Sequence, residues 1–141
     1  MRQFFQLIAL ISACNCSLSA NPQDDSPPAS HIECISSMRI PHYPILARSA
    51  RLQGAASVAL TVNVSGQAEG IDISGVAAIL TNSVREAISA ASYKLSCSGR
   101  AIRLHFHFVI KGTPSELPIT EITYSYPNLF VVATNPPIMM P

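Results

Sequence analysis

The chain has 141 residues, a formal net charge of +1, 48% hydrophobic residues and only 12% charged residues. This length fits one domain, and the apolar composition excludes a wholly disordered chain. The near-neutral charge argues against nucleic acid or a strongly anionic membrane surface as the main partner, because both usually require a basic patch. The longest basic feature is Arg48 with Arg51, an unremarkable pair within a predicted helix.

The N-terminus has the features of an export signal. Arg2 provides a short positive start, and residues 4–13 (FFQLIALISA) form an apolar run. Such a run has the length of a signal-peptide core and is far shorter than the roughly 20 residues of a membrane-spanning helix. A buried cytoplasmic helix is the alternative. We expect a signal peptide over residues 1–20 and a periplasmic or other extracytoplasmic location.

Two cleavage sites stay open, and they leave different cysteines in the mature chain. A sequence that resembles a bacterial lipobox ends at Cys14, and cleavage there would make this cysteine the site of a lipid anchor. Ordinary cleavage near residue 20 would instead remove Cys14 and Cys16 and leave only Cys34 and Cys97. An even pair of cysteines in an oxidising compartment predicts one disulfide, Cys34–Cys97.

A linker and a short helix are expected next. Residues 21–31 predict a flexible linker, because their stretch NPQDDSPPAS holds three prolines, adjacent aspartates and no large apolar side chain. The folded body is then expected over residues 32–112. Pro44 suits the first turn of a helix, residues 45–52 (ILARSARL) predict that helix, and Gly54 ends it.

A hairpin and a second helix follow. Strict alternation of apolar and small polar residues over 56–64 predicts a half-buried strand. A turn at Gly66 and a return strand over 68–73 complete the hairpin. Apolar residues at helical spacing between Leu80 and Ala91 predict the second helix.

The clearest strand covers residues 103–110, where apolar residues alternate with polar ones. The order α-β-β-α-β predicts an α+β fold, namely a small antiparallel three-stranded sheet with two helices packed on one face. Residues 113–141 hold six of the eleven prolines and an apolar patch at 129–132. They predict a Pro-rich extended tail, either along a sheet edge or without a fixed shape.

Two histidines are the main candidates for metal chemistry, and His42 is a candidate third ligand only by elimination. His105 and His107 project from the same side of the last predicted strand and could ligate a transition metal if a third ligand joined them. A solvated sheet face is the alternative, and we expect no cofactor and no bound metal. No nucleophile elbow, zinc-protease motif or phosphate-binding loop occurs in the sequence, so no enzymatic activity is expected.

A spaced set of residues around the first predicted helix suggests a family. These residues are, in order, Pro41, Tyr43, Pro44, Ala47, Arg48 and Gly54. Together with the order of elements that follows, they resemble the opening of the C-terminal domain of the TonB family. The resemblance covers roughly residues 38–110. It implies a periplasmic domain that holds the plug-side segment of outer-membrane receptors by pairing a sheet edge with a receptor peptide.

The resemblance implies an exported protein-binding module whose partner is an envelope protein such as a TonB-dependent receptor. The expected open edge lies near residues 102–110, with partner contacts from Arg103, His105, His107 and Val109. Tyr43 is expected to pack against the sheet, with direct partner contact as the alternative. The apolar N-terminal run is too short for the membrane helix of an energy transducer, and the linker is too short for its periplasmic spacer. Energy transduction is therefore the alternative function, and the oligomeric state stays open between monomer and homodimer.

Overall fold

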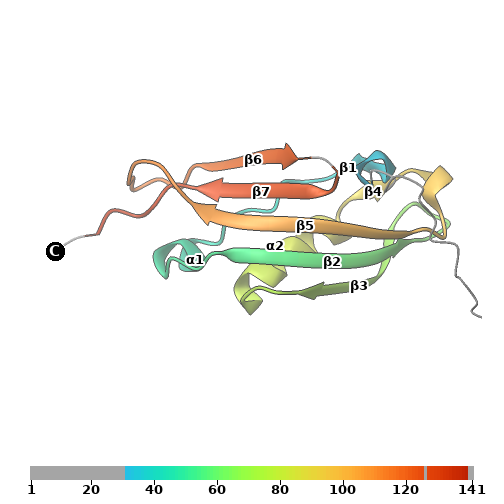
Figure 1. Ribbon diagram of the computed structural model, residues 1–141, viewed down its shortest axis with the longest axis horizontal. Coiled ribbons are helices and arrows are strands. Elements are labelled where there is room, and N and C mark those ends of the chain that lie inside the picture. The colour runs from blue at the N-terminus through green and yellow to red at the C-terminus, as the bar shows by residue number, and fades with distance from the viewer. Residues whose placement is uncertain (1–30, 126, 140–141) are drawn as a thin grey trace, which may run out of the picture.

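The computed structural model describes residues 31–125 and 127–139. The predicted signal peptide, the lipobox residue Cys14 and almost all of the predicted linker lie outside these ranges. The elements within them follow this order (Figure 1): η1 (His31–Cys34), β1 (Ile35–Ser37), α1 (Ile45–Ser49), β2 (Gly54–Val62), β3 (Ala68–Ser74), α2 (Ala78–Ser89), β4 (Ser92–Tyr93), η2 (Leu95–Cys97), β5 (Ala101–Ile110), β6 (Thr120–Ser125) and β7 (Leu129–Thr134).

The main sheet has five strands in the spatial order β3-β2-β5-β7-β6. All neighbours in it are antiparallel except β5 and β7, which run parallel. A separate two-stranded ladder joins β1 to β4. The α+β class and the first hairpin agree with the sequence-based prediction, but the prediction of a three-stranded, wholly antiparallel sheet is wrong. The prediction failed at residues 113–141, which we expected to form a tail but which supply strands β6 and β7.

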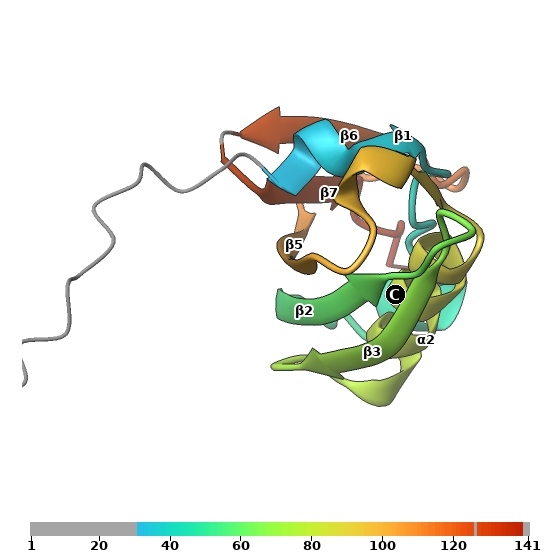
Figure 2. The same ribbon diagram turned by 90° about the vertical axis from the view of Figure 1, so that its right-hand side faces the viewer.

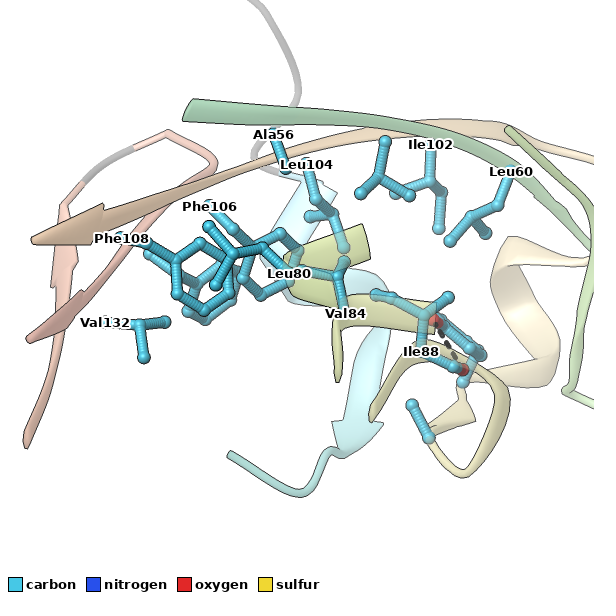
Figure 3. Packing of buried hydrophobic residues seen from close by; sticks show 14 of the residues in the cluster. Ala56, Leu60, Leu80, Val84, Ile88, Ile102, Leu104, Phe106, Phe108 and Val132 are labelled. Carbon is cyan, nitrogen blue, oxygen red and sulfur yellow. Dashed lines mark hydrogen bonds between the residues drawn. The ribbon is translucent and has the colours of Figure 1, made fainter. Parts of the chain in front are cut away.

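The core lies between the sheet and α2, which covers one face of the sheet (Figures 2 and 3). Alternate residues along β2 and β5 are buried, so the period of two in their sequences corresponds to one face of the sheet that packs against the core. On α2 the buried stripe is spaced at helical intervals. The residues of this core that are labelled in Figure 3 are Ala56, Leu60, Leu80, Val84, Ile88, Ile102, Leu104, Phe106, Phe108 and Val132.

The C-terminal residues form a hairpin, β6–β7, that belongs to this core. Phe130 is 6% exposed and stacks on Phe106, with ring centroids 5.1 Å apart and an interplanar angle of 14°. Val132, two residues further on, is fully buried. Residues 120–125 and 129–134 of the predicted Pro-rich tail therefore belong to the sheet, because burying these apolar side chains stabilises the hairpin against β5.

Candidate partner-binding site

The strand that we expected to present an open edge lies in the middle of the sheet. β5 pairs with β2 on one side, where His107 opposes Ala55, and with β7 on the other, where His107 opposes Val131. Val109 likewise opposes Ala133 of β7. The prediction of an open edge near residues 102–110 is therefore wrong over residues 105–110, which pair with β7. The physical reason is that β7 occupies the position where a partner strand would add.

The side chains proposed for that edge lie on the sheet face away from α2. Arg103, His105 and His107 are exposed there, and Val109 is half-buried. The Nδ1 atom of His105 lies 3.3 Å from the Oγ atom of Ser57 on β2. Over residues 31–125 and 127–139, no three His, Cys, Asp or Glu side chains gather in a way that could hold a metal ion. The predicted pair His105 and His107 thus finds no third ligand within the described chain.

The two outer strands of the sheet, β3 and β6, differ in how well they could accept another strand. β3 is interrupted by Gly70, which has φ of 58°, and its register with β2 shifts between Ala59 and Thr61. It also carries the acidic residues Glu69 and Asp72. A bulge and charges of this kind discourage further strand pairing. β3 is therefore a protected edge.

β6 is the more regular edge. Its six residues (TEITYS) contain no glycine or proline and pair with β7 in unbroken register from Thr120 to Ser125. Its one charged side chain is Glu121. Among the described residues, β6 is the last strand on its side of the sheet, so one row of its main-chain groups faces outward. Such a row is a template for a partner strand.

An apolar groove of about 340 Å³ runs beside β6. One wall is formed by Ile122 and Tyr124 of β6 with Phe130 of β7, and the other by residues 32–40, which we call the N-terminal arm. In Figure 2 β1, the central part of this arm, lies beside β6. The groove-lining side chains of the arm are Ile32, Ile35, Ser36, Ser37, Met38 and Ile40.

The groove is partly open to solvent, although some of the side chains that line it pack against the hydrophobic core. Ile40 is 55% exposed and Tyr124 is 39% exposed. Ile35, Met38 and Ile122 are half-buried and pack against the buried cluster. Side chains of an added strand that pointed toward α2 would therefore enter an apolar environment. We refer to this cavity as the arm groove.

The family-like residues around α1 build the support beneath the sheet. Pro41 and Ala47 are fully buried, and Tyr43 is 3% exposed. The Tyr43 ring meets Phe108 edge to face at a centroid distance of 5.5 Å, and its hydroxyl donates a hydrogen bond to the carbonyl oxygen of Leu52. Burial raises the pKa of this hydroxyl. The Tyr43 side chain is thus enclosed rather than presented to a partner.

Arg48 is the residue whose role the sequence did not indicate. Its side chain is only 4% exposed, although Arg51 nearby is exposed. Nε donates to the carbonyl oxygen of Asn135 at 2.8 Å, and one terminal nitrogen donates to the carbonyl oxygens of Pro136 at 3.1 Å and of Ser115. The guanidinium therefore ties α1 to the chain on both sides of the β6–β7 hairpin. No local pattern around residue 48 signals these contacts.

The predicted disulfide is present. Cys34 and Cys97 are bonded, with their Cα atoms 5.8 Å apart, and both residues are buried. The bond joins the start of the N-terminal arm to η2, just before β5. No helix formed by the described residues is long and apolar enough to cross a membrane.

These features define a small α+β domain with one protected and one regular sheet edge. The family model for the Gram-negative bacterial TonB protein C-terminal matches residues 39–111, just over half of the chain. The chain therefore belongs to the TonB C-terminal family, as its motif predicted, and this family is a periplasmic, transport-related one. Searches of curated proteins and of solved structures gave no match.

Proposed function

We propose that this chain is an exported TonB-like protein-binding module that engages an outer-membrane receptor or another envelope protein. The partner contributes an extended segment, which adds as a strand to the outer edge of β6. The observation that carries the proposal is the combination of a regular outer strand with an apolar groove beside it. Main-chain hydrogen bonds to β6 would supply affinity, and the arm groove would select side chains.

The geometry of β6 supports this choice of edge. Successive side chains of a strand point to opposite faces, and Ile122 and Tyr124 both line the arm groove. A strand added next to β6 would follow the same alternation. Every second side chain of the partner would then lie beside Ile122 and Tyr124, and the others would lie beside Glu121 and Thr123 on the opposite face.

The proposal is tested by removing one outward amide from β6. In an antiparallel pair, neighbouring residues alternate between amides that face the partner strand and amides that face outward. Ile122→Pro and Thr123→Pro are neighbours, so one of them removes an outward amide and leaves the ladder with β7 intact. We expect that this variant folds, as judged by circular dichroism, and no longer retains the envelope partner in a pull-down.

Ile73→Pro on β3 is the matched control, because Ile73 opposes Val58, whose main-chain groups face β5, so the Ile73 amide points outward from the protected edge. We expect a folded Ile73→Pro variant to retain the partner. Retention of the partner by folded proline variants at both β6 positions would contradict addition at this edge.

Export is a separate part of the proposal, carried by the apolar run at residues 4–13. Intact mass of the protein recovered from the cell envelope reports the cleavage site directly. Loss of residues 1–13 with an added lipid mass indicates acylation of Cys14, whereas loss of about residues 1–20 without it indicates ordinary cleavage. A mass that includes residues 1–20 would contradict export by a cleaved signal peptide.

A further inference from the structure

We propose that the Cys34–Cys97 disulfide positions the N-terminal arm as one wall of the arm groove, and so sets the affinity of the β6 edge for its partner strand. This inference rests on the proposed function. It assigns the disulfide a role in binding that is separate from stabilising the domain.

The arm groove is built almost wholly from parts of the chain that lie outside the family match. The match covers residues 39–111. Of the side chains that line the groove, only Ile40 falls within this range; the rest belong to the arm or to the β6–β7 hairpin. The groove is therefore an addition to the family domain, made where an N-terminal and a C-terminal extension meet.

The arm has little secondary structure of its own to hold it. β1 pairs with β4 only through Ile35 with Tyr93 and Ser37 with Ser92, and the register shifts between these two pairs. One further hydrogen bond joins the amide of Lys94 to the carbonyl oxygen of Cys34, at 2.8 Å. A two-stranded ladder this short is marginal in water without other support.

The disulfide fixes the arm to a well-anchored part of the body. The amide of Cys97 donates to the carbonyl oxygen of Lys94 at 2.9 Å, and the carbonyl oxygen of Cys97 accepts from the amide of Arg100 at 3.0 Å. Two residues beyond Cys97, the amide of Gly99 donates to the carbonyl oxygen of Val62 at the end of β2, at 2.8 Å. The bond therefore connects the arm to the main sheet through a short and rigid path.

The other end of the arm is held by the buried Pro41. With the bond in place, the arm is fixed at both ends and Ile35 and Met38 stay packed against the core. Without the bond, the covalent anchor at Cys34 is gone and the arm is held firmly only at Pro41. Binding a strand would then require the arm to be ordered at the same time, and this ordering weakens affinity.

The experiment compares the oxidised wild-type protein with Cys34→Ala/Cys97→Ala. The probe is a fluorescein-labelled peptide, Lys-Val-Thr-Val-Thr-Val-Lys, which presents apolar side chains at alternate positions. We expect affinity for this probe, measured by fluorescence anisotropy, to fall by about tenfold or more in the double variant. Hydrogen exchange should accelerate at Ile35 and Lys94 but stay slow in β2 and β5.

Two further variants separate positioning from stability. Leu80→Ala destabilises the fully buried start of α2 without touching the groove, and it should keep the wild-type affinity. Met38→Ala removes a side chain that lines the arm groove while the disulfide stays intact, and it should lower the affinity for the probe. Equal affinity in the double variant and the wild type would overturn the inference, and so would loss of slow exchange throughout β2 and β5. Failure of the wild-type protein to bind the probe would instead count against the proposed function.

Discussion

Replacing Arg48 with methionine tests whether the C-terminal hairpin is fastened to the family domain by this one side chain. The guanidinium makes three hydrogen bonds to main-chain carbonyl oxygens, and the residue is 4% exposed. Methionine keeps a long apolar stem but removes the donor to the carbonyl oxygens of Asn135 and Ser115, whereas that of Pro136 still accepts from the Ser115 amide at 3.1 Å. The change therefore removes the polar link and preserves most of the packing.

The size of the effect follows from the burial of these groups. A hydrogen bond from a charged donor contributes about 1.5–3 kcal/mol, and a buried acceptor left unpaired costs about 1–3 kcal/mol. Removing the cation also removes its cost of desolvation, which offsets part of the loss. We expect Arg48→Met to lower the free energy of unfolding by about 2–4 kcal/mol. At roughly 3–5 °C per kcal/mol for a domain of this size, Tm should fall by about 6–20 °C.

Urea denaturation measures the free energy, and hydrogen exchange shows where the structure loosens. Amides of β7 should exchange faster in Arg48→Met, with a smaller change in β2, because the lost bonds flank the hairpin. Arg51→Met is the matched control, since Arg51 is exposed three residues away on the same segment. Its stability should change by less than about 0.5 kcal/mol. Equal effects of the two substitutions would refute the assignment of Arg48 as the link to the hairpin.

Three further predictions concern stability. Burial raises the pKa of Tyr93 to about 12, so the contribution of its neutral hydroxyl to the free energy of unfolding is complete below pH 10 and is lost between about pH 10 and pH 12. Tyr93→Phe should therefore reduce the fall in unfolding free energy over that window by about 1–2 kcal/mol, after allowance for solvent screening. Urea titrations at stepped pH measure this change. Gly75→Ala should lower Tm by more than Gly70→Ala. Both positions have positive φ, but of the two only Gly75 would place a Cβ atom against a main-chain oxygen, that of Ala55 at 2.5 Å. Equal decreases in Tm would contradict this prediction. Phe130→Ala should cost about 3–5 kcal/mol in urea denaturation, because this ring is 6% exposed, and a cost below about 1 kcal/mol would mean that β7 is not part of the core.

The central part of the fold could be predicted from local periodicity. β2 and β5 show strict alternation, and α2 shows helical spacing of its apolar residues. Each element has one buried face, and the spacing of its apolar residues predicts that face directly. The hairpin β6–β7 could not be predicted in the same way. β7 contains a continuous apolar run (LFVVA) and so shows no period of two. β6 does alternate at Ile122 and Tyr124, but it is only six residues long and lies between Pro118 and Pro127, which favour an extended tail.

The binding site depended on the part that local periodicity could not reveal. Whether a strand is an edge is a property of the whole sheet, so the error at residues 113–141 moved the predicted edge from β6 to β5. The burial of Arg48 likewise depends on carbonyl groups 67 to 88 residues further along the chain. The disulfide was predictable because the count and the expected compartment of the cysteines constrain it without any knowledge of topology.

Photo-crosslinking from the outer sheet edges in living cells tests the binding mode most directly. A photoreactive residue is placed at Glu121 or Thr123 on β6 and, for comparison, at Asp72 on β3. We predict crosslinks from both β6 positions to one extended segment of an envelope protein, at partner residues two apart, because side chains on one face of a strand recur with a period of two. Crosslinks from Asp72 with none from β6, or crosslinks from β6 to scattered sites, would contradict strand addition at this edge.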